Sequence, residues 1–281
     1  MSIWPNDAKL ALSVVVNVEE GAEATIADGD RGPEPVDELG ITLKKAMRNY
    51  GNESNYQYGI KAGAPRVMAL LKKHNITSTF TAAAVALERA PELTQQIVAG
   101  GHEVCAHGYR WVHQFHMSEE KEREFIRAAI QSIERTTGQR PYGWLSRYLL
   151  TPNTRRLLIE EGYTYHMDDY SDDMPFWDTT EDGSMVIMPY TLDSNDMKMW
   201  TDPAYTPENW LKYAIDSFDW LYEEGKAGDP KMMSLGVHLR IIGRPGRIGA
   251  FDAFLEHVKR HDDVWIATRK DIRDHWAQHN S

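Results

Sequence analysis

The stretch Gly100-Gly-His-Glu-Val-Cys-Ala-His-Gly-Tyr-Arg-Trp111 brings a short apolar run to a histidine. Its centre, Glu103–Ala106, predicts a buried strand that ends at His107 and a glycine. The segment Met233–His238 repeats this pattern near the other end of the chain. Folds of the α/β class place their chemistry at the carboxyl ends of parallel strands. Each histidine alone is compatible with a structural role, but the pair favours a site.

A third apolar run, Leu10–Val18, ends in the carboxylate pair Glu19-Glu20. Adjacent carboxylates disfavour double ionisation, which raises the pKa of one of them and suits it to act as a general base. Successive residues of a strand point to opposite sides, so only one of the two is expected in the site. The other would anchor a loop through backbone N–H groups.

Most of the chain alternates predicted strands with predicted helices, which favours a mainly parallel sheet of the α/β class. A single domain over residues 1–281 is expected. The polar stretch 21–58 has little apolar periodicity, which is typical of a functional or interface loop. Further strands are expected at 77–83, 143–146, 163–168, 185–189 and 264–267, and helices at 64–74, 90–99, 118–137, 153–161, 207–224, 246–260 and 269–279.

Composition narrows the class of partner. The 281 residues carry a net charge of −11, which argues against nucleic acid and against an anionic membrane surface. No apolar run is long enough to predict a transmembrane helix, and the first residues do not resemble a secretory signal. The one cysteine, Cys105, lies inside a predicted strand and has no partner for an internal disulfide. These features predict a cytoplasmic protein.

Three of these segments fall on the motifs of a known family. The chain resembles the polysaccharide deacetylase (NodB-homology) superfamily, whose fold is a distorted (β/α) barrel with seven or eight strands. The family's Asp-Asp pair falls on Glu19-Glu20, its His-x-x-x-His motif on His107 and Trp111, and its Leu-x-x-His motif on His238.

The resemblance implies a divalent metal held by the second carboxylate and both histidines of the middle motif. Trp111 stands at the second histidine, and an indole nitrogen has no lone pair to offer a metal. If zinc were bound, Glu20 and His107 would be the matched ligands, with His113 or His116 as substitutes at another spacing. A catalytic zinc ordinarily has three protein ligands, so no metal is expected.

A narrower resemblance accounts for these differences. The chain is similar to the cofactor-independent bacterial allantoinases and to metal-independent cyclic imide hydrolases. This resemblance implies hydrolysis of a non-peptide carbon–nitrogen bond in a small cyclic amide, imide or ureide, by a homo-oligomer. Loop 145–150 differs from the allantoinase pattern, which leaves the substrate open. The matching segments include Asn17–Gly21, Glu53–Gly59, Ala106–Trp111, Pro152–Arg156, Pro189–Met197 and His238–Pro245.

The resemblance also suggests roles in catalysis. His238 is the expected general acid for the leaving nitrogen, and His107 is expected to hydrogen-bond the water or the carbonyl. We expect Glu20 to face the site, with Glu19 as the nearby base. Because strict alternation forbids both from facing the site, this arrangement requires a bulge in the strand.

Five further residues are expected to bind the substrate. Trp111 would form an apolar wall, and Arg240 would stabilise an oxyanion if its strand continues past His238. The alternatives are core packing for the tryptophan and a surface ion pair for the arginine. For the pair Asn195-Asp196, the alternative is a turn capped by hydrogen bonds of its own side chains. The full set is Trp111, Arg147, Asn195, Asp196 and Arg240.

Two other functions stay open on the sequence. One is a metal-dependent N-deacetylase acting on a polysaccharide, on peptidoglycan or on a small acetamide. The other is a non-catalytic barrel that binds a small molecule. Glu19, His107 and His238, each at the end of a predicted strand, favour an enzyme over the second.

Overall fold

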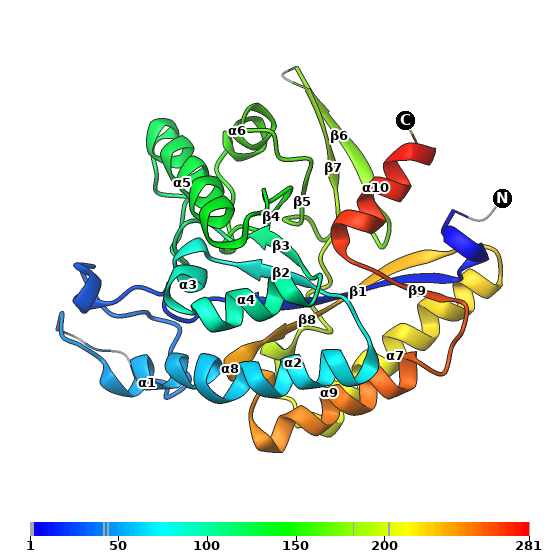
Figure 1. Cartoon of the computed structure of the whole chain (residues 1–281), viewed down its shortest axis with the longest axis horizontal. Helices are drawn as coiled ribbons and strands as arrows, with labels where there is room; N and C mark the ends of the chain where they lie inside the picture. The colour runs from blue at the N-terminus through cyan, green and yellow to red at the C-terminus, as the bar shows by residue number, and fades with distance from the viewer. Residues whose placement is uncertain (1–2, 42, 44, 182, 202, 281) are drawn as a thin grey trace.

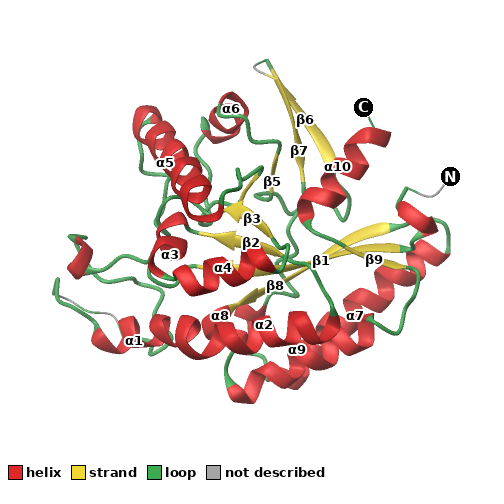
Figure 2. Ribbon diagram, in the orientation of Figure 1, coloured by secondary structure: helices red, strands yellow, loops and turns green. Residues whose placement is uncertain are grey.

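The computed structural model describes residues 3–41, 43, 45–181, 183–201 and 203–280. It is an α/β structure in which a curled sheet forms a half-barrel with helices around it (Figures 1 and 2). The sheet has nine strands in the described residues, in the order β6-β7-β5-β4-β3-β2-β1-β8, and β9 also pairs with β1. The expected distorted barrel is confirmed.

The bounds of the elements are as follows. The strands are β1 (Leu10–Val18), β2 (Thr79–Ala82), β3 (Glu103–Ala106), β4 (Gly143–Trp144), β5 (Tyr165–His166), β6 (Phe176–Thr180), β7 (Gly183–Ile187), β8 (Lys231–His238) and β9 (Val264–Ile266). The α-helices are α1 (Tyr50–Tyr58), α2 (Ala64–His74), α3 (Ala84–Arg89), α4 (Pro91–Ala99), α5 (Glu119–Thr137), α6 (Thr154–Glu160), α7 (Pro207–Lys226), α8 (Leu239–Ile242), α9 (Pro245–Val258) and α10 (Arg269–His279). Short helices are η1 (Pro5–Asp7), η2 (Ile26–Asp28), η3 (Gly59–Gly63) and η4 (Asp196–Met199).

Strand β1 is buried along its whole length and has a different core on each side. Its even-numbered residues, such as Val14 and Val16, pack in the larger hydrophobic cluster with the helices. Ala11 and Val15 belong to a second cluster inside the curled sheet, together with Cys105 of β3. The odd-numbered residues of β1 therefore point into the half-barrel.

The register of the parallel strands brings their carboxyl ends to one place. Asn17 of β1 lies opposite His238 at the end of β8, and Val18 lies opposite Ala82 at the end of β2. Ala82 in turn lies opposite Ala106, the residue before His107. The three segments that the sequence singled out therefore meet at the mouth of the half-barrel.

Strands β1 and β3 and helices α2 and α10 have the predicted bounds. Besides α8 and the short helices η1 to η4, three elements were not predicted. Helix α1 lies inside the stretch expected to be a loop, α3 precedes α4, and β6 adds an antiparallel hairpin strand to an otherwise parallel sheet. In the described residues, no helix is both long and apolar enough to span a membrane.

Candidate active site

A cavity of about 290 Å³ opens at the carboxyl ends of β1, β3 and β8. Glu19, His107 and His238 all line it, so the structure brings these three predicted residues together. Its size suits one small molecule. The other lining residues are Asn17, Trp111, Leu145, Ser146, Arg147, Tyr148, Tyr170, Tyr190, Leu192, Asn195, Met197, Lys198 and Thr201.

The Glu19 carboxylate occupies the centre of the polar part of the site. Its Oε1 lies 3.3 Å from Nε2 of His238 and 3.5 Å from Nε2 of His107. Its Oε2 accepts a 2.6 Å hydrogen bond from Nη1 of Arg240. Burial raises the pKa of Glu19, but the positive charges of Arg240 and His238 outweigh it and hold this pKa well below the ordinary value. Glu19 is therefore ionised at neutral pH.

His238 is held between two carboxylates. Its Nδ1 is 2.7 Å from Oδ1 of Asp196, and its backbone N–H donates to Oδ2 of the same carboxylate at 2.8 Å. Burial lowers the pKa of His238, but Glu19 and Asp196 outweigh it and raise this pKa to about 10. The imidazolium at neutral pH carries a proton on Nε2, where it faces Glu19 and the cavity.

His107 differs from His238 at Nε2, which accepts a hydrogen bond instead of donating one. Its Nδ1 lies 2.7 Å from the carbonyl oxygen of Leu145, which only accepts, so Nδ1 carries the hydrogen. Its Nε2 accepts a 3.1 Å hydrogen bond from the indole N–H of Trp111. The Nε2 lone pair is therefore engaged. This corrects the expected hydrogen bond from His107 to a water or a carbonyl, since the ring has no free donor.

The residues present do not fit the metal set that the family implies. A metal would need the Nε2 lone pair of His107, and Trp111 donates a proton to it. The two carboxylate oxygens of Glu20 accept from the backbone N–H groups of Glu19 and Arg240, both at 3.1 Å. The Arg240 guanidinium lies 3.7 Å from Glu20, where it opposes a cation.

The placement of Glu20 corrects the sequence prediction. Alternation continues without a bulge past the end of β1, so Glu19 follows Asn17 into the cavity and Glu20 points to the helical side. A Cβ added to Gly59 would collide with Oε1 of Glu20, which shows how closely η3 covers the Glu20 side chain. Glu20 instead lines a separate cavity of about 340 Å³.

Arg240 also differs from its expected position. Strand β8 ends at His238 and the chain turns into α8, so Arg240 does not extend along the strand into the cavity. Its guanidinium lies 4.4 Å from the ring centre of Tyr56 and bonds Glu19 from behind. It is fully buried and sets the charge of Glu19, rather than facing a substrate oxyanion.

Among the predicted substrate-binding residues, Trp111, Arg147 and Asn195 line the cavity. The Arg147 guanidinium stacks 3.8 Å from the Trp111 ring centre and forms a buried ion pair with Glu34, at 2.5 Å, in the long 21–58 stretch. Asp196 does not line the cavity. It holds His238 and accepts from Ile242 N at 3.1 Å, which makes it a positioning residue.

Several lining residues were missed in the sequence. Asn17 was detectable, because alternation puts it on the side of Glu19. The Tyr190 hydroxyl accepts from the side-chain amides of Asn17 at 3.2 Å and Asn195 at 3.1 Å. Tyr148 and Tyr170 come from loops, where no periodic signal marks them, and Tyr148 has a positive φ of 64°.

His113 and His116 do not supply substitute ligands at the cavity. Neither lines the cavity. Among the residues that the structure describes, neither belongs to a group of three side chains whose ligand atoms lie close enough to share a metal ion. Asp168, at the end of the strand expected at 163–168, is buried, and both of its carboxylate oxygens accept from the backbone N–H of Ser146. Burial raises the pKa of Asp168 to about 7.

Comparisons with known proteins agree with this architecture. The family model "Polysaccharide deacetylase" matches residues 54–166. A putative polysaccharide deacetylase of Schizosaccharomyces pombe is 34% identical over 98% of this chain and 92% of its own length. A probable polysaccharide deacetylase from Pseudomonas aeruginosa PAO1 is 43% identical, with a TM-score of 0.93 over 98% of this chain and 93% of that one. The crystal structure of PuuE allantoinase is 42% identical, with a TM-score of 0.94 over 99% of this chain and 94% of that one.

Proposed function

The chain belongs to the polysaccharide deacetylase family of hydrolases, and from this premise we propose that it opens a small cyclic amide, imide or ureide without a catalytic metal. One observation carries the proposal: the indole N–H of Trp111 donates a hydrogen bond to Nε2 of His107, the nitrogen whose lone pair a metal would need. An ionised Glu19 and a protonated His238 stand beside it as an acid/base pair. The likeness to an allantoinase supports the same reaction class.

In the proposed reaction, Glu19 accepts a proton from water as its oxygen attacks the ring carbonyl carbon. The carbon–nitrogen bond of the tetrahedral intermediate then breaks, and Nε2 of His238 gives its proton to the leaving nitrogen. The carboxylate of Glu19 and Nε2 of His238 are 3.3 Å apart, so the accepted proton can pass from one to the other. This transfer returns both groups to their starting states.

The intermediate's oxyanion needs a donor, and Tyr190 is the candidate. Its oxygen already accepts from two amides, which leaves its own O–H hydrogen to donate. Within the described residues no acceptor for that hydrogen is found, and the side chain lines the cavity. Burial raises the pKa of Tyr190, so the phenol keeps this proton. Such donors stabilise the charge that develops in the transition state.

The walls of the cavity favour a flat ring over a glycan chain. Trp111, Tyr148 and Tyr170 supply aromatic surface, and Leu145 and Leu192 add aliphatic surface. A cavity of about 290 Å³ is at the lower end of small-molecule sites. A polysaccharide deacetylase would act on a longer substrate and would require the histidine ligand that Trp111 replaces.

A substrate screen tests the proposal. Purified protein, treated with EDTA, is assayed against allantoin, hydantoin, succinimide and dihydrouracil, with chitooligosaccharides and peptidoglycan fragments as the competing class. Ring opening of at least one cyclic compound, with no acetate released from the glycans, is expected. Acetate release that depends on added metal would overturn the proposal in favour of the N-deacetylase. Wild-type binding of a cyclic compound with no turnover would favour a non-catalytic barrel.

The protein is also predicted to form a homo-oligomer through the 21–58 stretch. Leu39, Ile41, Met47 and Tyr50 in this stretch are each more than half exposed, which is unfavourable in water. Burial of these side chains against another subunit would remove that cost. Light scattering at micromolar concentration should give the mass of two or more chains of 32.2 kDa. A mass of one chain would contradict the prediction, and the double variant Leu39→Ser, Ile41→Ser should shift the mass toward one chain.

A further inference from the structure

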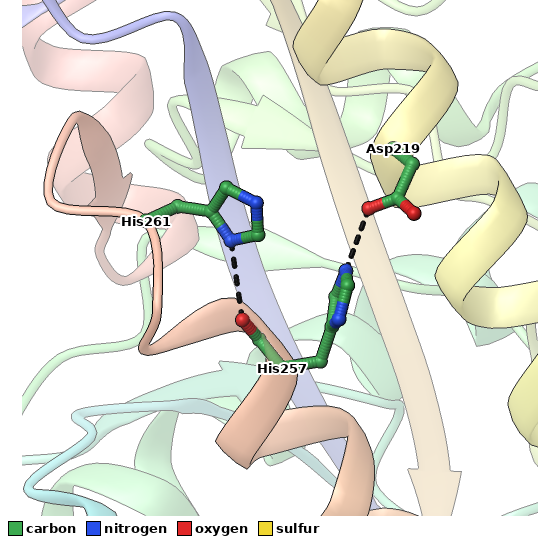
Figure 3. A group of neighbouring side chains, drawn as sticks. All are labelled: Asp219, His257 and His261. Atoms are coloured by element: carbon green, nitrogen blue, oxygen red, sulfur yellow. Dashed lines mark hydrogen bonds and ion pairs between the residues drawn. The ribbon is translucent and has the colours of Figure 1, made fainter.

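A second cluster of metal-type ligands lies on the outside of the half-barrel. Asp219 comes from the middle of α7, His257 from the last turn of α9, and His261 from the turn that follows α9 (Figure 3). One ligand atom from each lies within 4.8 Å of the others. We propose that these three residues bind a divalent transition metal of the zinc type.

The hydrogen bonds of the cluster prepare the histidines for this role. Nδ1 of His261 lies 3.1 Å from the backbone carbonyl oxygen of His257 and donates to it, which leaves the Nε2 lone pair free (Figure 3). Metal-binding histidines are ordinarily fixed in this way, with the second ring nitrogen bonded to a carbonyl or a carboxylate. Nε2 of His257 lies 2.6 Å from Oδ1 of Asp219, so these two groups share a proton that a metal can replace.

The distances require only a small adjustment. Zinc bonds of about 2.1 Å in a tetrahedron hold ligand atoms about 3.4 Å apart. The Asp219–His257 pair, 2.6 Å apart, must therefore open slightly, and the third ligand atom, within 4.8 Å of the other two, must move in by at most about 1.4 Å. Phe218 supports both imidazoles, with ring centres 5.5 Å from His257 and 5.1 Å from His261. The rings are thus held near the required positions before a metal arrives.

A second group of metal-type ligands on the surface is already occupied by a lysine. Its ligand atoms, from His74, Asp252 and Glu256, also lie within 4.8 Å of one another. The ammonium of Lys73, however, lies 2.8 Å from Asp252 and 3.2 Å from Glu256. A metal there would have to displace a fixed cation. In the part of the chain that the structure describes, Asp219 has no ion-pair partner except His257. At the Asp219 cluster the metal would displace only a proton, whereas at the His74 cluster it would have to displace the lysine as well.

The cluster is separate from the candidate active site. Val264, three residues after His261, lies opposite Leu10 at the amino end of β1, whereas Glu19 follows the carboxyl end of the same strand. A nine-residue strand spans about 30 Å. A metal here would join α7 to the end of α9, and its expected effect is on stability rather than on turnover.

Zinc titration of the metal-free protein tests the proposal. By calorimetry, the wild type should bind one Zn²⁺ per chain, and the binding should weaken in acid because protons compete for the same nitrogens. His261→Ala should weaken it by at least about tenfold, while the control His74→Ala should leave it unchanged. Thermal unfolding should follow the same order, with zinc raising the Tm of the wild type and of His74→Ala only.

Three results would overturn the proposal: no zinc binding by the wild type, equal binding by His261→Ala, or loss of binding in His74→Ala. Melting of the metal-free variants separates a lost ligand from a folding defect. Because neither variant touches the cavity, kcat of the metal-free protein should stay at the wild-type value in both. The outcome is therefore independent of the proposed reaction.

Discussion

Replacing Glu19 with Gln should lower kcat by about 10²–10⁴-fold, because an amide cannot accept the proton of the attacking water. Of the two carboxylates predicted to act as the base, Glu19 is the one that lines the cavity. Its low pKa makes it a weak base at rest, but one of the charges responsible is that of His238. His238 loses that charge only after the attack, when it gives its proton to the leaving nitrogen, and Glu19 then passes the proton it took from water to Nε2 of His238.

Glu20→Gln is the matched control for this substitution. It makes the same chemical change one residue later, where the side chain faces η3 and not the cavity. Its kcat should fall by less than about tenfold, although its stability should fall because its buried hydrogen bonds change. Equal losses above about 100-fold for both variants would show that both carboxylates act in the reaction. A Glu19→Gln enzyme of normal turnover would mean that the base is another group.

Replacing His238 with Ala should lower kcat by about 10²–10⁴-fold and change KM far less, since a proton donor acts in the transition state. The pH profile of the wild type gives a second measurement. Because the pKa of His238 is raised to about 10, the donor is protonated below that pH and kcat/KM is lost as the pH rises through it.

The variant Asp196→Asn separates the pKa of His238 from its presence as a proton donor. It removes one of the two charges that raise the pKa of His238, so the alkaline loss of kcat/KM should move to lower pH while the donor itself remains. An unchanged alkaline limb in this variant, or near-normal turnover in His238→Ala, would show that His238 is structural or that the leaving group needs no acid.

Much of the site could be predicted because apolar runs mark strands. Leu10–Val18 and Glu103–Ala106 are buried segments whose ends follow directly from the change to polar residues. The choice between Glu19 and Glu20 was harder, since β1 is buried on both sides and shows no apolar–polar alternation. The two polar residues in it, Ser13 and Asn17, both point into the half-barrel. They were the available signal that Glu19 faces the cavity.

Other features depended on contacts between distant segments. The turn of Arg240 out of the strand is fixed by Asp196, which accepts from the backbone N–H groups of His238 and Ile242. Forty-two residues separate Asp196 from His238, and no local pattern records that distance. The hydrogen bond from Trp111 to His107 was equally invisible, although the identity of Trp111 already argued against a metal ligand.

The most direct test of the central claim is kcat on a cyclic amide substrate, measured together with metal content before and after exhaustive chelation. His261→Ala serves beside the wild type, so that a metal on the outside of the half-barrel is not mistaken for one in the cavity. After chelation, the account predicts full kcat in both proteins with far less than one metal ion per active chain. Loss of turnover on chelation, restored by added zinc or nickel in the His261→Ala protein as well, would contradict it.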